Sequence, residues 1–377
     1  MDILVTDVKY RMSLAAIRDL SEAGHRVHLL HFGEGAPPAF ASRYASGRFV
    51  RADTEGADRA DAIFECAGAI GSAPAVFPVG AKSLAALAQA GPRPEAATLC
   101  PSADALRFAN NKARVAALAR ELGVPAPEEY PSPDDAEFPA VVKYRDGEAL
   151  GLDAPRRYRI VKDRAALDDA FRDMSAAASA GGQPPPLIQR YIPGDGYGVS
   201  AVFDRDGRPV NIICHHRLRE YPITGGPSAL CETVWEPRLV EWAVALLQAL
   251  GWRGVAMAEF KGTPETGFRL LEINPRIWGS FPLTRAAKTG FSEDYVRAAS
   301  GEWLPEYREP HYPLGVKMGF RYSNLAAALS YGKKLKLGKA AAAAVDALTV
   351  RDGVLERSDP AVNKAYKRYV FLERNSQ

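Results

Sequence analysis

The sequence predicts an α/β protein made of several lobes, and three features of its 377 residues indicate this. The first hundred residues alternate short apolar segments with amphipathic ones, a pattern typical of a small parallel sheet covered by helices on both faces. A run of glycine and proline at 181–186 is typical of a linker between lobes. Beyond it, two alternating segments at 255–260 and 268–276 flank a turn-forming stretch and predict an antiparallel hairpin.

The N-terminal segment should form strand, helix and strand in succession, and then repeat the unit. Leu14, Ile17 and Leu20 have helical spacing, and Gly24 ends that helix. No glycine-rich turn follows the first strand, so we do not expect this region to bind a dinucleotide. The predicted elements are strands at 3–6, 27–30 and 76–79, and helices at 13–23 and 83–90.

Composition excludes several classes of protein. Hydrophobic residues make up 47% of the chain, enough for packed cores. The 48 Lys and Arg nearly balance the 45 Asp and Glu, and a formal charge of +3 favours neither nucleic acid nor an anionic membrane as the main partner. There is no run of 18 apolar residues, and the acidic Asp2 does not fit a signal peptide, so we expect a cytoplasmic protein. The four cysteines lack paired spacing and should be reduced.

The predicted hairpin brings acidic residues together. Side chains alternate along a strand, so Glu272 and Asn274 share one face. With a turn centred at 264–265, Glu259 should lie opposite Leu270 and diagonal to Glu272, about 7–8 Å away. Two carboxylates this close need a cation or a proton, and an oxygen-only set suits Mg²⁺ or Mn²⁺. At a metal site, glutamine in place of Glu272 should abolish turnover, and because it relieves repulsion with Glu259, stability without nucleotide should hold or rise. On a solvated face, which is the alternative, activity should be near normal and stability should change by no more than about 0.5 kcal/mol.

Two lysines stand where a phosphate could bind. Lys112 lies in the first turn of a predicted helix at 110–122, where the helix dipole disfavours a lysine unless an anion is near. Lys143 ends the apolar strand 140–142 and precedes a polar loop at 144–151, an arrangement by which many sites offer a charge to phosphate. An ordinary solvated lysine is the alternative at Lys112.

These pieces occur in one order over about residues 1–300, and the order resembles the ATP-grasp superfamily. Glu-Ile-Asn-Pro-Arg at 272–276, with Glu259 thirteen residues before Glu272, is similar to the metal-binding end of that superfamily. The segment from Asn111 to 127 resembles its first nucleotide lysine and the strand entry that follows.

Three further segments extend the resemblance. Residues 138–143 look like the strand that bears the second lysine, and 187–194 like the hinge strand that holds adenine. The stretch 215–222, followed by Gly-Gly-Pro-Ser at 225–228, resembles in particular the carboxylate–amine ligases of the superfamily.

The resemblance implies an ATP-grasp fold of α+β lobes behind an N-terminal Rossmann-like pre-ATP-grasp domain. It implies ATP and Mg²⁺ as cofactors, and Glu259, Glu272 and Asn274 as metal ligands. Asp195 would hold the ribose, although relatives commonly have a glutamate nearby. The adenine site would comprise Gln189, Arg190, Tyr191 and Ile192, and the expected domains are 1–103, 104–186 (N-lobe), 187–305 (C-lobe) and 306–377 (C-terminal extension).

Three arginines form a second predicted layer. Arg217 and Arg219 stand two residues apart on a predicted strand and should point to the same side. Guanidinium groups bind carboxylates and phosphates through paired hydrogen bonds. With Arg276 at the end of the hairpin, we expect these arginines to hold the transferring phosphoryl group and the acyl substrate. A basic outer sheet face is the alternative.

The implied reaction is ATP-dependent joining of a small-molecule carboxylate to an amine through an acyl phosphate, with release of ADP and phosphate. A kinase or carboxylase acting on another acceptor, and a non-catalytic nucleotide-binding module, are the rivals. The substrates, the pathway and the oligomeric state, a homodimer included, stay open. Beyond residue 300 the pattern predicts a strand at 316–323 and a basic helix at 333–345 whose lysines are solvated.

Overall fold

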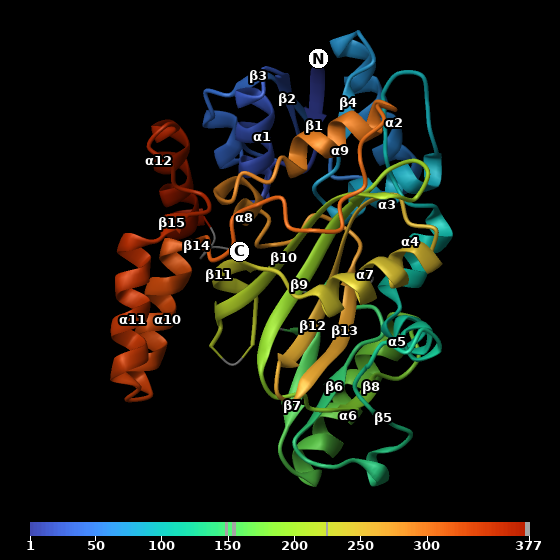
Figure 1. Ribbon diagram of the computed structural model, residues 1–377, viewed down its shortest axis with the longest axis vertical. Helices are drawn as coiled ribbons and strands as arrows, with labels where there is room; N and C mark the ends of the chain where they lie inside the picture. The colour runs from blue at the N-terminus through green and yellow to red at the C-terminus, as the bar shows by residue number, and fades with distance from the viewer. Residues whose placement is uncertain (148–149, 153–155, 224, 374–377) are drawn as a thin grey trace.

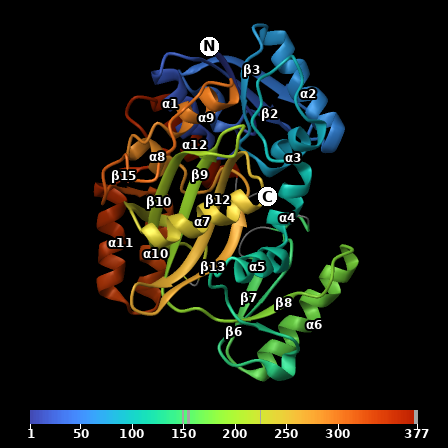
Figure 2. The same cartoon turned by 45° about the vertical axis from the view of Figure 1, so that its right-hand side comes forward.

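The computed structural model of the chain describes residues 1–147, 150–152, 156–223 and 225–373. In this described part the strands form three sheets, and helices lie against them (Figures 1 and 2). The mixed α/β class predicted from the sequence is confirmed.

The N-terminal sheet is parallel throughout, with the order β3-β2-β1-β4. It contains the predicted alternation of strands and helices. One strand and one helix of this region, β3 and α2, are not predicted by the sequence pattern; β3 is an edge strand whose residues are only exposed or half-buried, so it lacks an apolar run. The elements are β1 (Asp2–Val5), α1 (Ser13–Glu22), β2 (Arg26–Phe32), β3 (Ala45–Arg51), α2 (Gly56–Ile70), β4 (Ala75–Phe77) and α3 (Ala81–Ala90).

A small antiparallel sheet of order β5-β8-β6-β7 lies at the opposite end of the molecule, with α6 packed on it (Figure 1). The segment 181–186 leads from α6 into β8, which pairs with β6. This segment therefore connects the helix that packs on this sheet to one of the sheet's own strands, whereas the sequence suggests a boundary between lobes there. The elements are β5 (Glu129–Tyr130), β6 (Ala140–Lys143), β7 (Tyr158–Val161), α6 (Arg164–Ala180) and β8 (Leu187–Arg190).

The third sheet has the order β13-β12-β9-β10-β11-β14-β15 and divides two apolar cores. Val255 and Met257 of β12 join the core that includes α1, α8 and α9, whereas Ala256, Ala258 and Phe260 join the core with α4, α5 and α7. β12 and β13 pair antiparallel, which confirms the predicted hairpin. The strands are β9 (Asp195–Phe203), β10 (Pro209–Glu220), β11 (Ser228–Val234), β12 (Gly254–Thr263), β13 (Gly267–Asn274), β14 (Lys317–Gly319) and β15 (Arg351–Asp352), and the helices are α4 (Ala103–Asn110), α5 (Lys112–Glu121), α7 (Pro237–Ala249), α8 (Pro282–Ala286) and α9 (Phe291–Ala299).

Beyond residue 300 the predicted elements are partly wrong. The expected strand 316–323 is only β14, and the expected helix 333–345 is a helical hairpin of α10 (Arg321–Lys333) and α11 (Leu337–Thr349), followed by α12 (Pro360–Arg368). Leu335 has a left-handed backbone, with φ of 56°, and this turns the chain between the two helices. The exposure of Leu325 and Leu329 on α10 explains why no clear apolar face marks that helix in the sequence.

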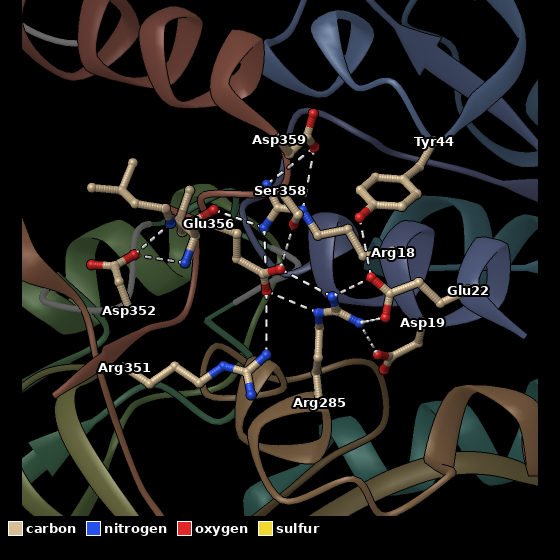
Figure 3. Close-up of polar contacts among 12 residues, drawn as sticks. Arg18, Asp19, Glu22, Tyr44, Arg285, Arg351, Asp352, Glu356, Ser358 and Asp359 are labelled. Carbon is tan, nitrogen blue, oxygen red and sulfur yellow. Dashed lines mark hydrogen bonds and ion pairs between the residues drawn. The ribbon is translucent and has the colours of Figure 1, made fainter.

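Buried charges fasten the C-terminal region to α1 and α8 (Figure 3). Arg18 is fully buried and donates hydrogen bonds to Asp359, at 3.2 and 3.3 Å, and to the carbonyl of Val354 at 2.7 Å. Arg285 of α8 lies among three carboxylates, those of Asp19, Glu22 and Glu356. The segment 354–359 is therefore anchored on both α1 and α8. In the described ranges no helix has the length and apolarity needed to cross a bilayer.

Candidate active site

A cavity of about 280 Å³ lies between the small sheet and the large sheet. Lys143 of β6 and Tyr158 of β7 line it from one side, and Arg217 of β10 and Glu259 of β12 line it from the other. Most residues predicted for the site are among its lining. These are Lys112, Lys143, Gln189, Arg190, Tyr191, Ile192, Arg217, Glu259, Glu272, Asn274 and Arg276.

The two hairpin carboxylates are closer partners than predicted. Glu259 pairs in register with Glu272, and Phe260 pairs with Leu270, so the expected pairing of Glu259 with Leu270 is wrong. The turn is centred on Glu265, because Thr263 pairs with Gly267, and a bulge leaves Leu271 as an extra residue on β13. Each of these two features moves the partner of Glu259 by one residue. The carboxamide of Asn274 donates hydrogen bonds to both carboxylates, at 3.3 Å to Glu259 and 3.2 Å to Glu272. The three side chains thus form one polar group.

Each carboxylate has its own cation. Arg217 donates two parallel hydrogen bonds to Glu259, at 2.8 and 2.6 Å, and Nζ of Lys112 lies 3.0 Å from Oε2 of Glu272. Burial raises the pKa of Glu259, although the Arg217 guanidinium opposes this. Burial acts the same way on Glu272, but Lys112 and Lys143 outweigh it and lower the pKa of that carboxyl to about 2. Both pairs form across long sequence separations, so spacing alone did not indicate them.

Lys143 is held at the centre of the site. Its Nζ donates to the carbonyl of Leu271 at 3.2 Å, the residue that the bulge inserts. Burial, with a contribution from neighbouring Lys112, lowers the pKa of Lys143 to about 8. A buried lysine with few protein partners can donate to an incoming anion. Glu148 and Ala149 of the polar loop predicted after Lys143 lie outside the described residues.

The donor set fits a hard divalent cation. Glu259, Glu272 and Asn274 offer carboxylate and carboxamide oxygens, which Mg²⁺ and Mn²⁺ prefer. Among the residues that the structure describes, no group of three or more His, Cys, Asp or Glu side chains could hold a metal ion alone. A cation here would therefore complete its shell with water and with the oxygens of a bound phosphate, as Mg²⁺ commonly does.

The predicted adenine strand lines the cavity with part of its side chains. Gln189 is buried, and its Nε2 donates to Glu129 at 3.3 Å. Arg190 is half exposed and points to Glu128, at 3.3 Å, and to Glu137, so its guanidinium belongs to the surface. Lys261 was not predicted; its Nζ lies 5.1 Å from the ring centre of Tyr191. The signal for Lys261 is its place two residues after Glu259, on the same strand face.

Two predicted site residues do not line the cavity. Asp195 is exposed at the start of β9 and lies 3.1 Å from Nε2 of His216, so the structure gives no support to its ribose role. Arg219 donates instead to Asn324, at 2.6 Å, and to Asp346, at 2.8 Å. The expectation that Arg217 and Arg219 share a side is wrong because the pairing of β10 with β11 shifts register between them.

The predicted third arginine and several unpredicted residues complete the lining. Arg276 borders the cavity and donates to the carbonyl of Ile277 at 3.1 Å. Glu220 lies 3.6 Å from Arg217, and Tyr158 and Trp278 supply aromatic surface. Gly198, in register with Glu259 on the neighbouring strand, must lack a side chain, because a Cβ there would lie 2.3 Å from the ring of His215.

Comparison with known proteins supports the superfamily that the motifs predicted. Residues 183–325 match a family described as ATP-grasp in the biosynthetic pathway with Ter operon. Pyruvate carboxylases from Aspergillus niger and Aspergillus terreus are 27% identical to the chain over 164 and 163 residues. These alignments cover 40% of this chain but only 13% of each carboxylase, so the chain spans a small part of those relatives.

Solved structures extend the likeness to most of the fold. Biotin carboxylase from Campylobacter jejuni superposes with a TM-score of 0.65 at 18% identity, over 84% of this chain and 74% of that one. The biotin carboxylase domain of Hydrogenobacter thermophilus 2-oxoglutarate carboxylase gives 0.65 at 16% identity, over 84% and 73%. These superpositions show that the chain has the ATP-grasp fold. The family match over residues 183–325 supports a place in the ATP-grasp superfamily.

Proposed function

We propose that the chain is an ATP-dependent ligase that joins a small-molecule carboxylate to an amine. One observation carries the proposal: Lys112 and Lys143 meet the group of Glu259, Glu272 and Asn274 inside a single cavity. Positive charge for a triphosphate then lies beside an oxygen-only cation site, which is what phosphoryl transfer requires of a protein. ATP and Mg²⁺, or Mn²⁺ in its place, are the cofactors of this proposal.

Nucleotide binding would use the side of the cavity nearest the small sheet. Gln189, Tyr191 and Ile192 would contact the adenine, and Lys143 would donate to the phosphates. Lys112 now contacts Glu272, and a triphosphate would compete for this contact because it offers more negative charge. A bound Mg²⁺ would neutralise the phosphates and the two carboxylates together.

Two arginines are placed to hold the acyl substrate and the transferring group. Nε of Arg217 is buried and has no hydrogen-bond partner among the described residues, so one donor stays available to a substrate oxygen. Arg276 borders the same cavity. The substrate carboxylate oxygen would attack the γ-phosphorus and break its bond to ADP. The amine would then attack the acyl carbon and break its bond to phosphate, which leaves an amide.

Several broader expectations stay part of this proposal. They are the domains 1–103, 104–186, 187–305 and 306–377, of which 148–149, 153–155, 224 and 374–377 lie outside the described residues; the second and third share one sheet through the pairing of β6 with β8. They also include small-molecule partners, a homodimer as the assembly, and a cytoplasmic location, where ATP is supplied.

Carboxylation is the second candidate, and the relatives favour it. The similar curated proteins are pyruvate carboxylases, and the Hydrogenobacter thermophilus domain was solved as a dimer with MgADP and bicarbonate. In this candidate, bicarbonate takes the place of the acyl carboxylate at Arg217 and Arg276. The two reactions differ in the carboxyl group that is phosphorylated.

The test is a screen for substrate-dependent phosphate release with ATP and Mg²⁺. Amino acids and small carboxylates form one arm, and bicarbonate alone forms the other. Hydroxylamine included in each reaction should trap an acyl phosphate as a hydroxamate, and ADP should be the nucleotide product. AMP and pyrophosphate would refute an acyl-phosphate route, and release that depends on bicarbonate alone would favour the carboxylase. The Glu259→Gln variant, prepared identically, controls for contaminating ATPase.

A further inference from the structure

The hairpin of α10 and α11 carries large apolar side chains on its exposed surface. The two helices pack on each other at the edge of the molecule (Figures 1 and 2). Leu335 and Leu337, both within the turn at 333–339, are 84% and 70% exposed, and Leu329 and Leu348 on the helices are 70% and 73% exposed. Single exposed apolar residues are ordinary, but several on one small element mark an interaction surface.

Positive charge is concentrated on the same element. The hairpin, residues 321–349, contains five lysines and arginines and one acidic residue, Asp346, so it has a formal charge of +4 whereas the rest of the chain has −1. The turn 333–339 reads Lys-Lys-Leu-Lys-Leu-Gly-Lys, and all seven residues are exposed. In the described part of the chain, its four lysine side chains make no ion pair or hydrogen bond. The net charge of +3, which argued against a membrane partner, is a sum over the whole chain. It does not show that basic residues are concentrated on this hairpin.

The hairpin is firmly attached to the large sheet. Arg219 of β10 donates to Asn324 of α10 at 2.6 Å and to Asp346 of α11 at 2.8 Å. With 13 residues in each helix, the hairpin is about 20 Å long, and the basic turn lies at one of its ends. The turn is therefore presented on a fixed support.

We propose that this basic turn, residues 333–339, docks the protein peripherally on an anionic phospholipid surface. Leucines that alternate with lysines on a convex turn suit a fluid interface, where apolar side chains enter the headgroup region and lysines contact lipid phosphates. An acidic protein partner would need a matching groove for Leu335 and Leu337, whereas lipids rearrange around them. The basic turn shares no residue with the lining of the candidate active site.

Vesicle co-sedimentation tests the proposal with the full chain. The protein should bind phosphatidylcholine vesicles that contain phosphatidylserine, should not bind pure phosphatidylcholine, and should dissociate as salt rises. Replacing the four turn lysines by glutamine should weaken binding by at least about tenfold. The double variant Leu335→Ser with Leu337→Ser should also bind the vesicles more weakly, but the salt dependence of its binding should be the same as that of the wild type. The glutamine variant exchanges Lys333, Lys334, Lys336 and Lys339.

A matched control separates the turn from overall charge. Four other exposed lysines lie far from this turn in the sequence, and their change to glutamine alters the net charge equally. This control should bind as the wild type does, and thermal unfolding of all variants should be unchanged. Equal loss in the control and the turn variant, or no binding of the wild type to anionic vesicles, would overturn the proposal. So would wild-type binding by the turn variant. The control exchanges Lys162, Lys288, Lys364 and Lys367.

Discussion

Glu272→Gln should destabilise the protein without nucleotide, because the structure gives this carboxylate two cationic neighbours. Lys112 lies 3.0 Å from it, and Lys143 is buried nearby. From the sequence alone, with only Glu259 as a neighbour, the same substitution would relieve repulsion and stability would hold or rise. Glutamine keeps the shape of the side chain but leaves the two lysines facing each other without a counter-charge. The sequence and the structure therefore predict changes of opposite sign in the free energy of unfolding of this variant.

The magnitude follows from the pKa of Glu272. Its shift from 4.5 to about 2 corresponds to about 3 kcal/mol of stability, since one pKa unit is about 1.4 kcal/mol. The carboxylate is 29% exposed, and solvent screening reduces the expected loss to about 2 kcal/mol. Because the folded-state pKa is depressed, the stabilisation is complete above the unfolded pKa near 4.5 and is lost as the pH falls towards 2.

Urea unfolding at pH 7 without nucleotide measures this loss. A double-mutant cycle with Lys112→Met should give a coupling of about 1–2 kcal/mol between the two side chains. Glu265→Gln, at the exposed turn of the same hairpin, is the matched control and should unfold as the wild type does. The difference between wild type and Glu272→Gln should narrow below about pH 5. A variant as stable as the wild type, or more stable, would refute the reasoning.

Three further predictions concern the cation site, the nucleotide and the buried charges. Because both hairpin carboxylates already have cationic partners, Mg²⁺ alone should bind weakly. Its affinity should rise at least about tenfold when ADP is present. Calorimetry that gives equal Mg²⁺ affinities with and without ADP would contradict this. Lys143→Ala should weaken ATP binding by about 1.5–3 kcal/mol, whereas Lys162→Ala should not, and unchanged affinity would place the phosphates elsewhere. Arg285→Met should destabilise the fold by about 3–5 kcal/mol because three carboxylates lose their common partner; thermal unfolding of this variant beside Arg297→Met, an exposed ion-pair control, checks it.

The sequence by itself determined the features that depend on neighbouring residues. Alternation along a strand put Glu272 and Asn274 on one face, and the structure keeps them there, joined by a hydrogen bond. The apolar run before Lys143 predicted a strand ending at that lysine, and β6 ends there. Asn111 caps α5 by accepting from the backbone of Arg114, and this fixes Lys112 in the first turn. Such features need only local geometry, so periodicity and capping rules found them.

Only the tertiary structure decided which side chains meet. Register shifts on β10 and β13 turned Arg219 away from the cavity and set Glu259 opposite Glu272, and a bulge depends on the partner strand as much as on its own residues. Arg217 reaches Glu259 across 42 residues because β9 aligns β10 with β12. Spacing within one segment carries no information on such pairs, since the packing of the sheets brings them together. The same packing gave each carboxylate its cation, and so decided the sign of the Glu272 prediction.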